Sequence, residues 1–274
     1  MNSVSRTSGV DKYSTFGMRE QWIKNFFDLF EDYFLDYGGL GPKQITAMIN
    51  WLREAELLDQ KDKKVSQLAT ELRPVFFESP LTVYEIIWIN LCFNSAVVNT
   101  YVTKLNSLQG YTKEDLIANL QESYPSIGVS TLANPIGALI NTFENSPFGY
   151  SMEEGTSIDN LQMGVITGSG RKGNKKISII GGAPISPYSM AYLLYKIAET
   201  SGVYEFVVSD FFKEGELNPK KIFNISKTEF LKDLRSAEEL GFLKVDLVAG
   251  LENVHLNRNV STSAIVSALR KRYE

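Results

Sequence analysis

The amino-acid sequence predicts a mainly α, α+β protein in which two winged-helix-like units flank a helical middle region, with a basic β-hairpin before the second unit. Apolar residues recur at helical spacing through much of the chain. An alternating segment near residue 170, rich in glycine and lysine, has the pattern of a hairpin instead. Near both ends of the chain, helices joined by short turns precede a basic or hairpin-like connection, which is the order of a winged helix.

Residues 1–80 make up the predicted N-terminal winged-helix-like unit. Apolar residues from Met18 to Tyr37 follow a helical period, and Gly38 and Gly39 end that helix. The next helix, LGPKQITAMINWLREAELL, begins at Pro42, because proline is favoured in the first turn of a helix. A polar run, DQKDKK, follows where a winged helix has a wing or a loop that contacts the DNA backbone.

Residues 81–160 form the predicted helical middle region. Thr82 and Glu85 have the spacing of a capping box, in which each side chain bonds to the backbone N–H of the other residue. They would open one long apolar helix, TVYEIIWINLCFNSAVVNTYVTKL. Two further helices are expected after it, over Thr112–Glu122 and over Thr131–Glu144.

Residues 161–274 hold the predicted basic hairpin and the C-terminal winged-helix-like unit. In LQMGVITGSGRKGNKKISIIGG, two strand-like runs flank a basic, glycine-rich turn. Capping signals then open helices at Ser186 and at Ser226, and Ser226 with Glu229 has the spacing of a capping box. The expected elements are a helix over 186–199, a short helical piece over 207–212, a helix over 226–240, a hairpin in FLKVDLVAGLENVHL and a closing helix over 261–273.

The composition indicates a soluble cytoplasmic protein that can bury large hydrophobic cores. The chain has 274 residues, of which 43% are hydrophobic and 22% are charged, and its formal net charge is −4. The polar N-terminus shows no signal peptide, and no uncharged apolar run approaches the roughly 20 residues that a membrane span needs. Because the chain is acidic overall, any contact with DNA must come from local positive patches.

The sequence contains no convincing catalytic centre. Its single cysteine, Cys92, and its single histidine, His255, cannot form an intrachain disulfide or a Cys/His zinc site. Cys92 lies in an apolar helix, which favours a packed core residue over a thiolate, and His255 has no nucleophile nearby in the sequence. Glu153 and Glu154 are adjacent in a loop, with nothing to separate their pKa values. We therefore expect no metal, no cofactor and no catalytic residues.

Two glycine-rich turns resemble phosphate-binding loops. Gly168–Gly173 matches G-x-G-x-x-G, but a strand follows it rather than a helix, and Asn174 stands where a P-loop requires lysine. A flexible hairpin tip is therefore favoured over a dinucleotide site. The turn Gly181–Ser186 lies between a strand and a helix start, where backbone amides could hold an anion. A tight turn followed by an N-cap is the favoured alternative there.

The helix that begins at Pro42 is the first candidate for contact with nucleic acid. It is the second helix of a helix-turn-helix pair, which is the position of a recognition helix. Side chains that suit base edges and phosphates dominate its polar face. These residues are Lys43, Gln44, Thr46, Asn50 and Arg53. A solvated helix face is the alternative, and the acidic residues Glu54 and Glu56 would oppose DNA binding.

Two further basic stretches suit a phosphate backbone. The hairpin tip carries Arg171, Lys172, Lys175 and Lys176. The helix that follows Ser226 exposes Lys227, Lys232 and Arg235. That patch is diluted by the acidic residues Glu229, Asp233, Glu238 and Glu239. Because winged helices also serve as modules for protein docking and dimerisation, the helix that follows Ser226 need not contact nucleic acid at all.

The layout is similar to an uncharacterised bacterial family, from about Tyr13 to Tyr273. The resemblance rests on FGMREQW, GLGPKQITAMINWLREAELL, WINLCFNSAVVNTY, STLANPIGALINTF and IFNISKTEFLKDLRSAEELGFLKVDLVAGLENVHL. That family, a domain of unknown function, is fused to or encoded beside proteins resembling phosphoadenosine phosphosulfate reductase, in gene clusters for DNA phosphorothioation and phage defence. The resemblance implies a defence-associated accessory protein. The reductase name is not transferred, because Ile180-Gly-Gly-Ala-Pro-Ile lacks the leading serine and the aspartate of the reductases' Ser-Gly-Gly-x-Asp-Ser loop.

Three functions are consistent with the sequence. The first is a non-catalytic protein that binds double-stranded DNA in a bacterial DNA-modification or phage-defence system, and it requires that distant basic residues converge on one surface. The second is a scaffold that docks a reductase-like protein or other defence-system proteins and touches no DNA. The third is an anion- or nucleotide-binding enzyme that uses the Gly181–Ser186 turn. No membrane partner is expected, and homo-oligomerisation is left open.

Overall fold

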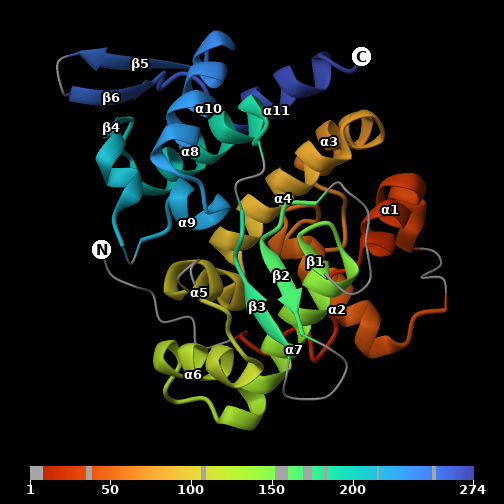
Figure 1. Cartoon of the computed structure of the whole chain (residues 1–274). Helices are drawn as coiled ribbons and strands as arrows, with labels where there is room; N and C mark the ends of the chain where they lie inside the picture. The colour runs from red at the N-terminus through yellow and green to blue at the C-terminus, as the bar shows by residue number, and fades with distance from the viewer. Residues whose placement is uncertain are drawn as a thin grey trace.

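The computed structural model describes residues 9–34, 39–105, 109–151, 160–168, 175–181, 184–214, 216–248 and 251–274. These residues form a mainly helical α+β protein with eleven α-helices and two small three-stranded sheets. Figure 1 shows α4 (Pro80–Asn94) near the centre of the molecule, with the elements of the C-terminal part gathered at one end. The expected mainly α, α+β class is confirmed, and the winged-helix assignment of the two units stays a prediction.

The N-terminal helices form because their apolar residues fall on one face. Helix α1 (Glu20–Leu29) ends earlier than the sequence indicated and continues as the 3-10 turn η1 (Phe30–Phe34). Helix α2 (Pro42–Glu54) begins at the expected proline, and α3 (Gln67–Glu78) follows it. Among the described residues, strand pairing between α2 and α3 is limited to one antiparallel bridge, Leu58 with Val65. This bridge lies where a wing was expected.

Helix α4 is the central element, because it is buried on every side. All residues from Thr82 to Cys92 are buried, as in a core helix that other elements surround. Helix α4 contacts α2, α3 and α8 (Pro187–Ser201). At the extended residue Ser95 the chain bends by 93° into α5 (Ala96–Lys104). The single long helix expected from the sequence is therefore wrong, and two helices replace it.

The capping box expected at the start of α4 is also wrong. The helix begins earlier, at Pro80, and the hydroxyl of Thr82 pairs with the hydroxyl of Ser79 at 2.9 Å. Pro80 suits the first turn, because it lacks the N–H that a first-turn residue leaves unpaired. Glu85 turns instead toward a distant part of the chain, where its carboxylate accepts the backbone N–H of Ser186 at 3.1 Å.

Polar side chains of α4 tie the N-terminal elements to the C-terminal ones. The indole of Trp88 donates to the carbonyl of Ile222 at 2.8 Å. The buried amide of Asn90 donates to the carbonyl of Ala55 at 3.1 Å, and its oxygen accepts the hydroxyl of Tyr192 at 2.9 Å. Because such groups are costly to leave unpaired in a core, these bonds fix how α2, α4 and α8 meet.

Helices α6 (Lys113–Ser123) and α7 (Val129–Asn145) agree with the sequence expectation. Thr112 forms a capping box with Asp115 at the start of α6, since each side chain bonds to the backbone N–H of the other residue. Helix α6 packs on α5 and α7, and α7 in turn contacts the first sheet. These helices thus form the layer on which the basic hairpin rests.

The first sheet contains the expected hairpin. Strand β1 (Gly149–Ser151) runs parallel to β2 (Gly164–Thr167), and β2 is antiparallel to β3 (Lys176–Ser178). The basic hairpin predicted from the sequence is therefore confirmed as the pair β2–β3. The tip of its turn, residues 169–174, lies outside the described part of the chain.

Gly17, in the segment before α1, lies directly against the backbone of α7. A Cβ atom at this position would lie 2.3 Å from the nitrogen of Thr142 and 2.6 Å from the carbonyl oxygen of Ala138. The close approach lets the backbone N–H of Met18 donate to the hydroxyl of Thr142 at 2.9 Å. Glycine is therefore needed at residue 17 for packing.

Gly17→Ala is expected to lower the free energy of unfolding by about 3 kcal/mol, because the added methyl group forces the N-terminal segment away from α7. Gly137→Ala within α7 is the matched control, since the nearest atoms to its Cβ lie 3.8 Å away. That control is expected to raise stability by roughly 0.5–1 kcal/mol, as alanine is the better helix former. Urea unfolding measures both, and equal stabilities of the two variants would contradict the close packing at Gly17.

The C-terminal elements follow the expected order. After α8, which ends at the left-handed residue Gly202, they are β4 (Glu205–Val207), the 3-10 turn η2 (Val208–Phe212), α9 (Pro219–Phe223), α10 (Lys227–Glu239), β5 (Leu243–Val248), β6 (Leu251–Leu256) and α11 (Thr262–Lys271). The capping box of Ser226 with Glu229 is confirmed at the start of α10. The second sheet is antiparallel with the order β4-β6-β5, so the expected hairpin is confirmed as β5–β6.

The buried apolar residues form one cluster that extends from Val10 to Leu269. Helix α11 packs on α3 as well as on α8, so the two ends of the chain share this core. The boundaries expected near residues 80 and 160 stay a prediction about the organisation of the sequence. Within the described residues, no single helix is long and apolar enough to cross a membrane, although α4 and α5 together meet that test by length and composition.

Candidate nucleic-acid interface

Two residues at the start of α2 that were predicted to contact DNA make hydrogen bonds within the helix instead. Gln44 accepts the backbone N–H of Gly41 at 3.1 Å, which caps the helix start. The hydroxyl of Thr46 donates to the carbonyl of Pro42 at 3.0 Å. Lys43 is exposed, and no ion pair involves it within the described residues. Of these three side chains, Lys43 is therefore the one that is free to meet a phosphate.

Farther along α2, two predicted contact residues hold neighbouring loops. The amide of Asn50 donates to the carbonyl of Lys12 at 2.8 Å. The guanidinium of Arg53 donates to the carbonyl of Asp62 at 3.3 Å. Both side chains are half-buried. These contacts give the polar face of α2 a structural role, and contact between α2 and DNA stays a prediction.

The acidic residues that were expected to oppose DNA binding at the end of α2 are themselves paired. Glu54 is 5% exposed, and its Oε1 lies 2.9 Å from the Nζ of Lys12. Glu56 contacts the Nζ of Lys196 on α8 at 2.6 Å. They therefore act as links within the fold and contribute little negative potential at the surface of α2.

Asn50→Ala is expected to lower the free energy of unfolding by about 1 kcal/mol, because the carbonyl of Lys12 loses its donor. The affinity for duplex DNA should be unchanged. Lys43→Ala is the matched control on the same helix and should alter stability by less than about 0.5 kcal/mol. Urea unfolding and a DNA titration on the same preparations test this. A loss of DNA affinity at unchanged stability in Asn50→Ala would make Asn50 a contact residue instead.

The described part of the basic hairpin carries one paired and one exposed lysine. Lys175 lies 2.8 Å from the carboxylate of Glu144 on α7. Lys176 on β3 is exposed. Arg171 and Lys172, which were also expected to bind phosphates, lie outside the described residues. The strand end next to the hairpin turn is therefore positively charged, and Glu144 neutralises part of that charge through its ion pair with Lys175.

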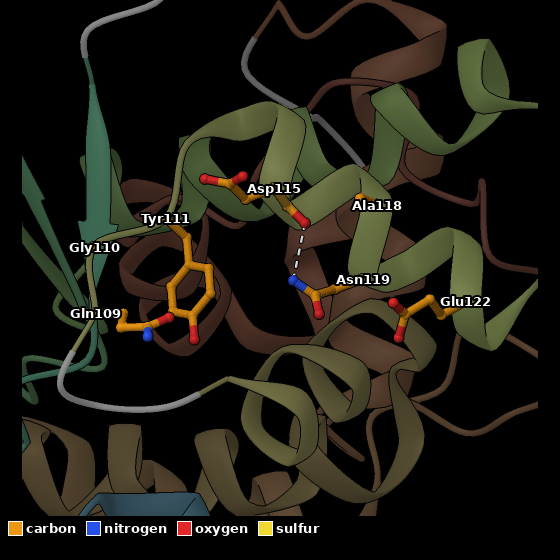
Figure 2. Close-up of a pocket in the computed structure, with 7 residues that line it drawn as sticks. All are labelled: Gln109, Gly110, Tyr111, Asp115, Ala118, Asn119 and Glu122. Carbon is orange, nitrogen blue, oxygen red and sulfur yellow. Dashed lines mark hydrogen bonds between the residues drawn. The ribbon is translucent and has the colours of Figure 1, made fainter.

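An open pocket of about 290 Å³ lies beside this hairpin, because the backbone of Tyr111 pairs with Ile177 of β3. Figure 2 shows Tyr111 and Gln109 on one side of the pocket and Asn119 and Glu122 of α6 on the other, with Asp115 of α6 above Tyr111. The charge of Lys176 contributes to holding the pKa of Asp115 below its usual value, after the hydrogen bonds from Thr112. Asp115 and Glu122 therefore place negative charge near the basic hairpin, as the acidic residues of α10 do near its basic side chains.

All three basic side chains of α10 that were predicted to contact phosphates are exposed. Lys227 lies 2.5 Å from the carboxylate of Glu252 on β6, and Arg235 lies 2.6 Å from that of Glu238. Lys232 is exposed, and no ion pair involves it within the described residues. The side chains of Lys227 and Arg235 are 51% and 47% exposed. Such pairs contribute at most about 1 kcal/mol, so a phosphate can replace the carboxylate.

The residues predicted to contact DNA lie on separate elements in the described part of the chain. Helix α10 contacts α8, α9 and β5, whereas α2 contacts α4 and the hairpin β2–β3 lies against α7. Figure 1 shows α10 with the C-terminal sheet at one end of the molecule and α2 in the other half. The convergence of these basic stretches on one surface stays a prediction.

The carboxyl group of Glu85 is buried at the start of α8, at the turn that was one candidate for binding an external anion. Glu85 is 3% exposed and accepts the backbone N–H of Ser186. Burial raises the pKa of Glu85 to about 7, and the nearby charge of Asp233 on α10 adds to this effect. Burial also raises the pKa of Asp233 to about 6. Residues 182–183 of the turn lie outside the described residues, but the helix start already receives a carboxylate of the chain itself.

Cys92 and His255, which the sequence did not favour as catalytic residues, lie in the core and on the second sheet. Cys92 is fully buried, and burial raises the pKa of its thiol, so the expected core role is confirmed. The Nε2 of His255 on β6 lies 3.1 Å from the carboxylate of Asp246 on the adjacent strand β5. Glu153 and Glu154 lie outside the described residues.

Sequence comparison establishes the family. Residues 11–273 match the model of a family described as protein of unknown function, DUF4007. The chain belongs to the DUF4007 family. Among curated proteins, no sequence match is found. Membership of a family of unknown function over nearly the whole chain, as expected from the resemblance, is thus confirmed, while its link to phosphorothioation and defence clusters remains a prediction.

Two crystal structures of SspB resemble this DUF4007 chain over nearly its whole length. The magnesium ion-bound structure matches with a TM-score of 0.70 at 15% identity, covering 99% of this chain and 90% of the SspB chain. The other matches with a TM-score of 0.68 at 15% identity, covering 97% and 88%. At this identity the likeness shows the fold alone. Within the part of the chain that the structure describes, no group of three or more His, Cys, Asp or Glu side chains is placed to hold a metal ion.

Proposed function

We propose that this chain is a DNA-binding accessory protein of a bacterial DNA-modification or phage-defence system. The observation that carries the proposal is the order of its C-terminal elements. Helix α8, strand β4, helices α9 and α10 and the hairpin β5–β6 follow one another as the elements of a winged helix do. The sheet order β4-β6-β5, in which the first strand pairs with the last, agrees with that assignment. The defence setting rests on the family resemblance.

In this proposal α10 is the helix that enters the major groove, because it directly precedes the hairpin that would serve as the wing. Lys227, Lys232 and Arg235 would contact phosphates from α10. On β5 the side chain of Lys244 is 73% exposed, which suits a wing that follows the backbone. The exposed Glu229 and Glu239 of α10 oppose binding, so moderate affinity with strong salt dependence is expected.

The other nominated residues are proposed to have smaller roles. Lys43 on α2 and Lys176 on β3 are exposed and can add phosphate contacts with a long or bent duplex. Lys175 would have to leave Glu144, and Arg171 and Lys172 extend the same group by sequence. The remaining predicted contact residues of α2 mainly stabilise the fold through their hydrogen bonds. They are Gln44, Thr46, Asn50 and Arg53.

The proposal is tested by titrating a short fluorescent duplex with the purified chain at several salt concentrations. Each phosphate contact steepens the fall of log K with log salt by about 0.9, so three to five contacts predict a slope between about −3 and −5. Binding should be detectable at the lowest salt concentration used. If the duplex does not bind even there, the DNA-binding proposal fails.

A protein-interaction scaffold is the second candidate function. It is favoured by the carboxylate partners of Lys175, Lys227 and Arg235, which reduce the positive charge available to DNA. The chain would then dock a reductase-like or other defence protein through protein contacts alone. Co-purification of neighbouring gene products with the tagged chain distinguishes the two functions. Retention after nuclease treatment, together with no duplex binding, would favour the scaffold.

A further inference from the structure

Two side chains of α10 bond to the backbone of β5 at Val245. Strand β5 lies at the edge of its sheet, because the strand order is β4-β6-β5. The Oε1 of Glu238 accepts the backbone N–H of Val245 at 2.8 Å. The guanidinium of Arg235 donates to the carbonyl of Val245 at 3.3 Å. Helix α10 therefore occupies both backbone polar groups of Val245 and closes this part of the sheet edge to another strand.

The carboxylate of Glu238 makes two contacts, one with each oxygen. While Oε1 bonds to Val245, Oε2 lies 2.6 Å from the Nη1 of Arg235. The N–H of Val245, followed by the guanidinium of Arg235, holds the pKa of Glu238 below its usual value. The carboxylate is thus charged, and a charged acceptor forms a stronger hydrogen bond than a neutral one. A phosphate that replaces Glu238 as the partner of Arg235 would leave the bond to Val245 in place.

A second polar contact joins α10 to the hairpin at the other end of the helix. Lys227, the first residue of α10, lies 2.5 Å from the carboxylate of Glu252 on β6. This pair is exposed and contributes at most about 1 kcal/mol. The bond from Glu238 is directed at the backbone of a buried residue, since Val245 is 5% exposed. Glu238 is therefore the stronger of the two polar links.

The bond at Val245 lies directly beside the exposed lysine of β5. Successive residues of a strand face opposite sides of a sheet. Val245 accordingly faces the core, while the side chain of Lys244 is 73% exposed. Fixing the backbone of Val245 to α10 therefore also fixes the place from which Lys244 extends into solvent.

We infer that Glu238 is a positioning residue, which holds the hairpin β5–β6 against α10 so that Lys244 and the basic side chains of α10 meet one duplex together. The inference rests on the proposed DNA-binding function of α10. It gives an acidic residue a role that favours DNA binding, although the charge of that residue repels phosphates. Because the two effects have opposite signs, substitutions can separate them.

Three variants distinguish the hydrogen bond from the charge. Glu238→Gln removes the charge and keeps an oxygen that can accept the N–H of Val245, whereas Glu238→Ala removes both. Glu239→Ala is the matched control, because it removes an exposed charge from the next position of α10. Glu238→Gln and Glu239→Ala should bind a short duplex at least as tightly as the wild type, since each removes a repulsion.

Glu238→Ala should bind the duplex about fivefold or more weakly than Glu238→Gln, because the hairpin is no longer held. Its slope of log K against log salt should be shallower by about 0.9, as the phosphate contact of Lys244 is lost. Fluorescence anisotropy across salt concentrations measures both. If Glu238 only stabilised the fold, Glu238→Ala would melt at a lower temperature, and the folded protein would bind DNA as Glu238→Gln does. That result would overturn the positioning role.

Hydrogen exchange of the Val245 amide, followed by NMR without DNA, tests the bond itself. Exchange in Glu238→Ala should be on the order of tenfold faster than in Glu238→Gln. Equal exchange in the two variants would overturn the inference, whatever the DNA affinities are. A wild type that binds no duplex would overturn the proposed function and this inference with it. Binding by the wild type, with equal affinities of Glu238→Ala and Glu238→Gln, would overturn the inference alone.

Discussion

Lys227→Glu combined with Lys232→Glu is expected to lower the affinity for duplex DNA on the order of 100-fold. Both side chains project from α10 into solvent, so the substitutions change attraction of phosphates into repulsion without disturbing the core. Because the variant can no longer bind two of the phosphates, the slope of log K against log salt should become shallower by about 1.8. Fluorescence anisotropy with a short duplex, repeated across salt concentrations, measures both quantities.

Lys104→Glu combined with Lys113→Glu is the matched control, because it changes the net charge equally from exposed positions on α5 and α6. This variant should bind DNA within about threefold of the wild type, since its charges lie away from α10. Thermal unfolding of both variants verifies that the fold is retained. Equal losses of affinity in the two variants would mean that overall charge, and not the α10 surface, governs binding.

Glu85→Gln is expected to raise the free energy of unfolding at pH 8 by up to about 3 kcal/mol and to have little effect near pH 4. The pKa of this carboxyl group is raised by burial from 4.5 to about 7 in the folded protein. The folded state therefore holds the proton more tightly than the unfolded state does. The resulting stabilisation is full below pH 4.5 and is lost as the pH rises through 7. Glutamine stays neutral and keeps an oxygen that can accept the N–H of Ser186.

Urea unfolding of the wild type and Glu85→Gln between pH 4 and pH 8 measures this difference. Taking the difference removes the contribution of other titrating groups, including Asp233, as long as they behave alike in both proteins. Glu122→Gln, at an exposed position on α6, should show no pH-dependent difference from the wild type. A stabilisation by Glu85→Gln that is the same at every pH, or a destabilisation at pH 8, would contradict the raised pKa of the Glu85 carboxyl group.

Local sequence patterns predicted the elements whose signals are contained within a few residues. The capping box of Ser226 with Glu229 depends on bonds between neighbouring residues, and it is present at the start of α10. The hairpin β2–β3 follows from two strand-like runs around a glycine-rich turn, and its pairing is as expected. Such features need no information about the rest of the chain, which is why sequence alone suffices for them.

The same kind of pattern failed where a distant residue supplied the partner. Thr82 and Glu85 have capping-box spacing, but Ser186 gives Glu85 a better-placed N–H in the core. The apolar run after Thr82 shows no break in hydrophobicity, so it did not indicate the bend at Ser95, which arises as α5 turns to pack on other helices.

The candidate site shows the same limit. The sequence identified which residues are basic, but not that Glu144 faces Lys175 or that Glu252 faces Lys227.

Hydrogen exchange of the chain with and without a bound duplex tests most directly whether α10 and the following hairpin form the DNA-binding surface. Bound DNA should slow amide exchange over residues 226–256, which include α10, β5 and β6, and leave α1, α5 and α6 unchanged. Protection confined to other elements, such as α2, or no protection under conditions in which the duplex is bound, would contradict the assignment.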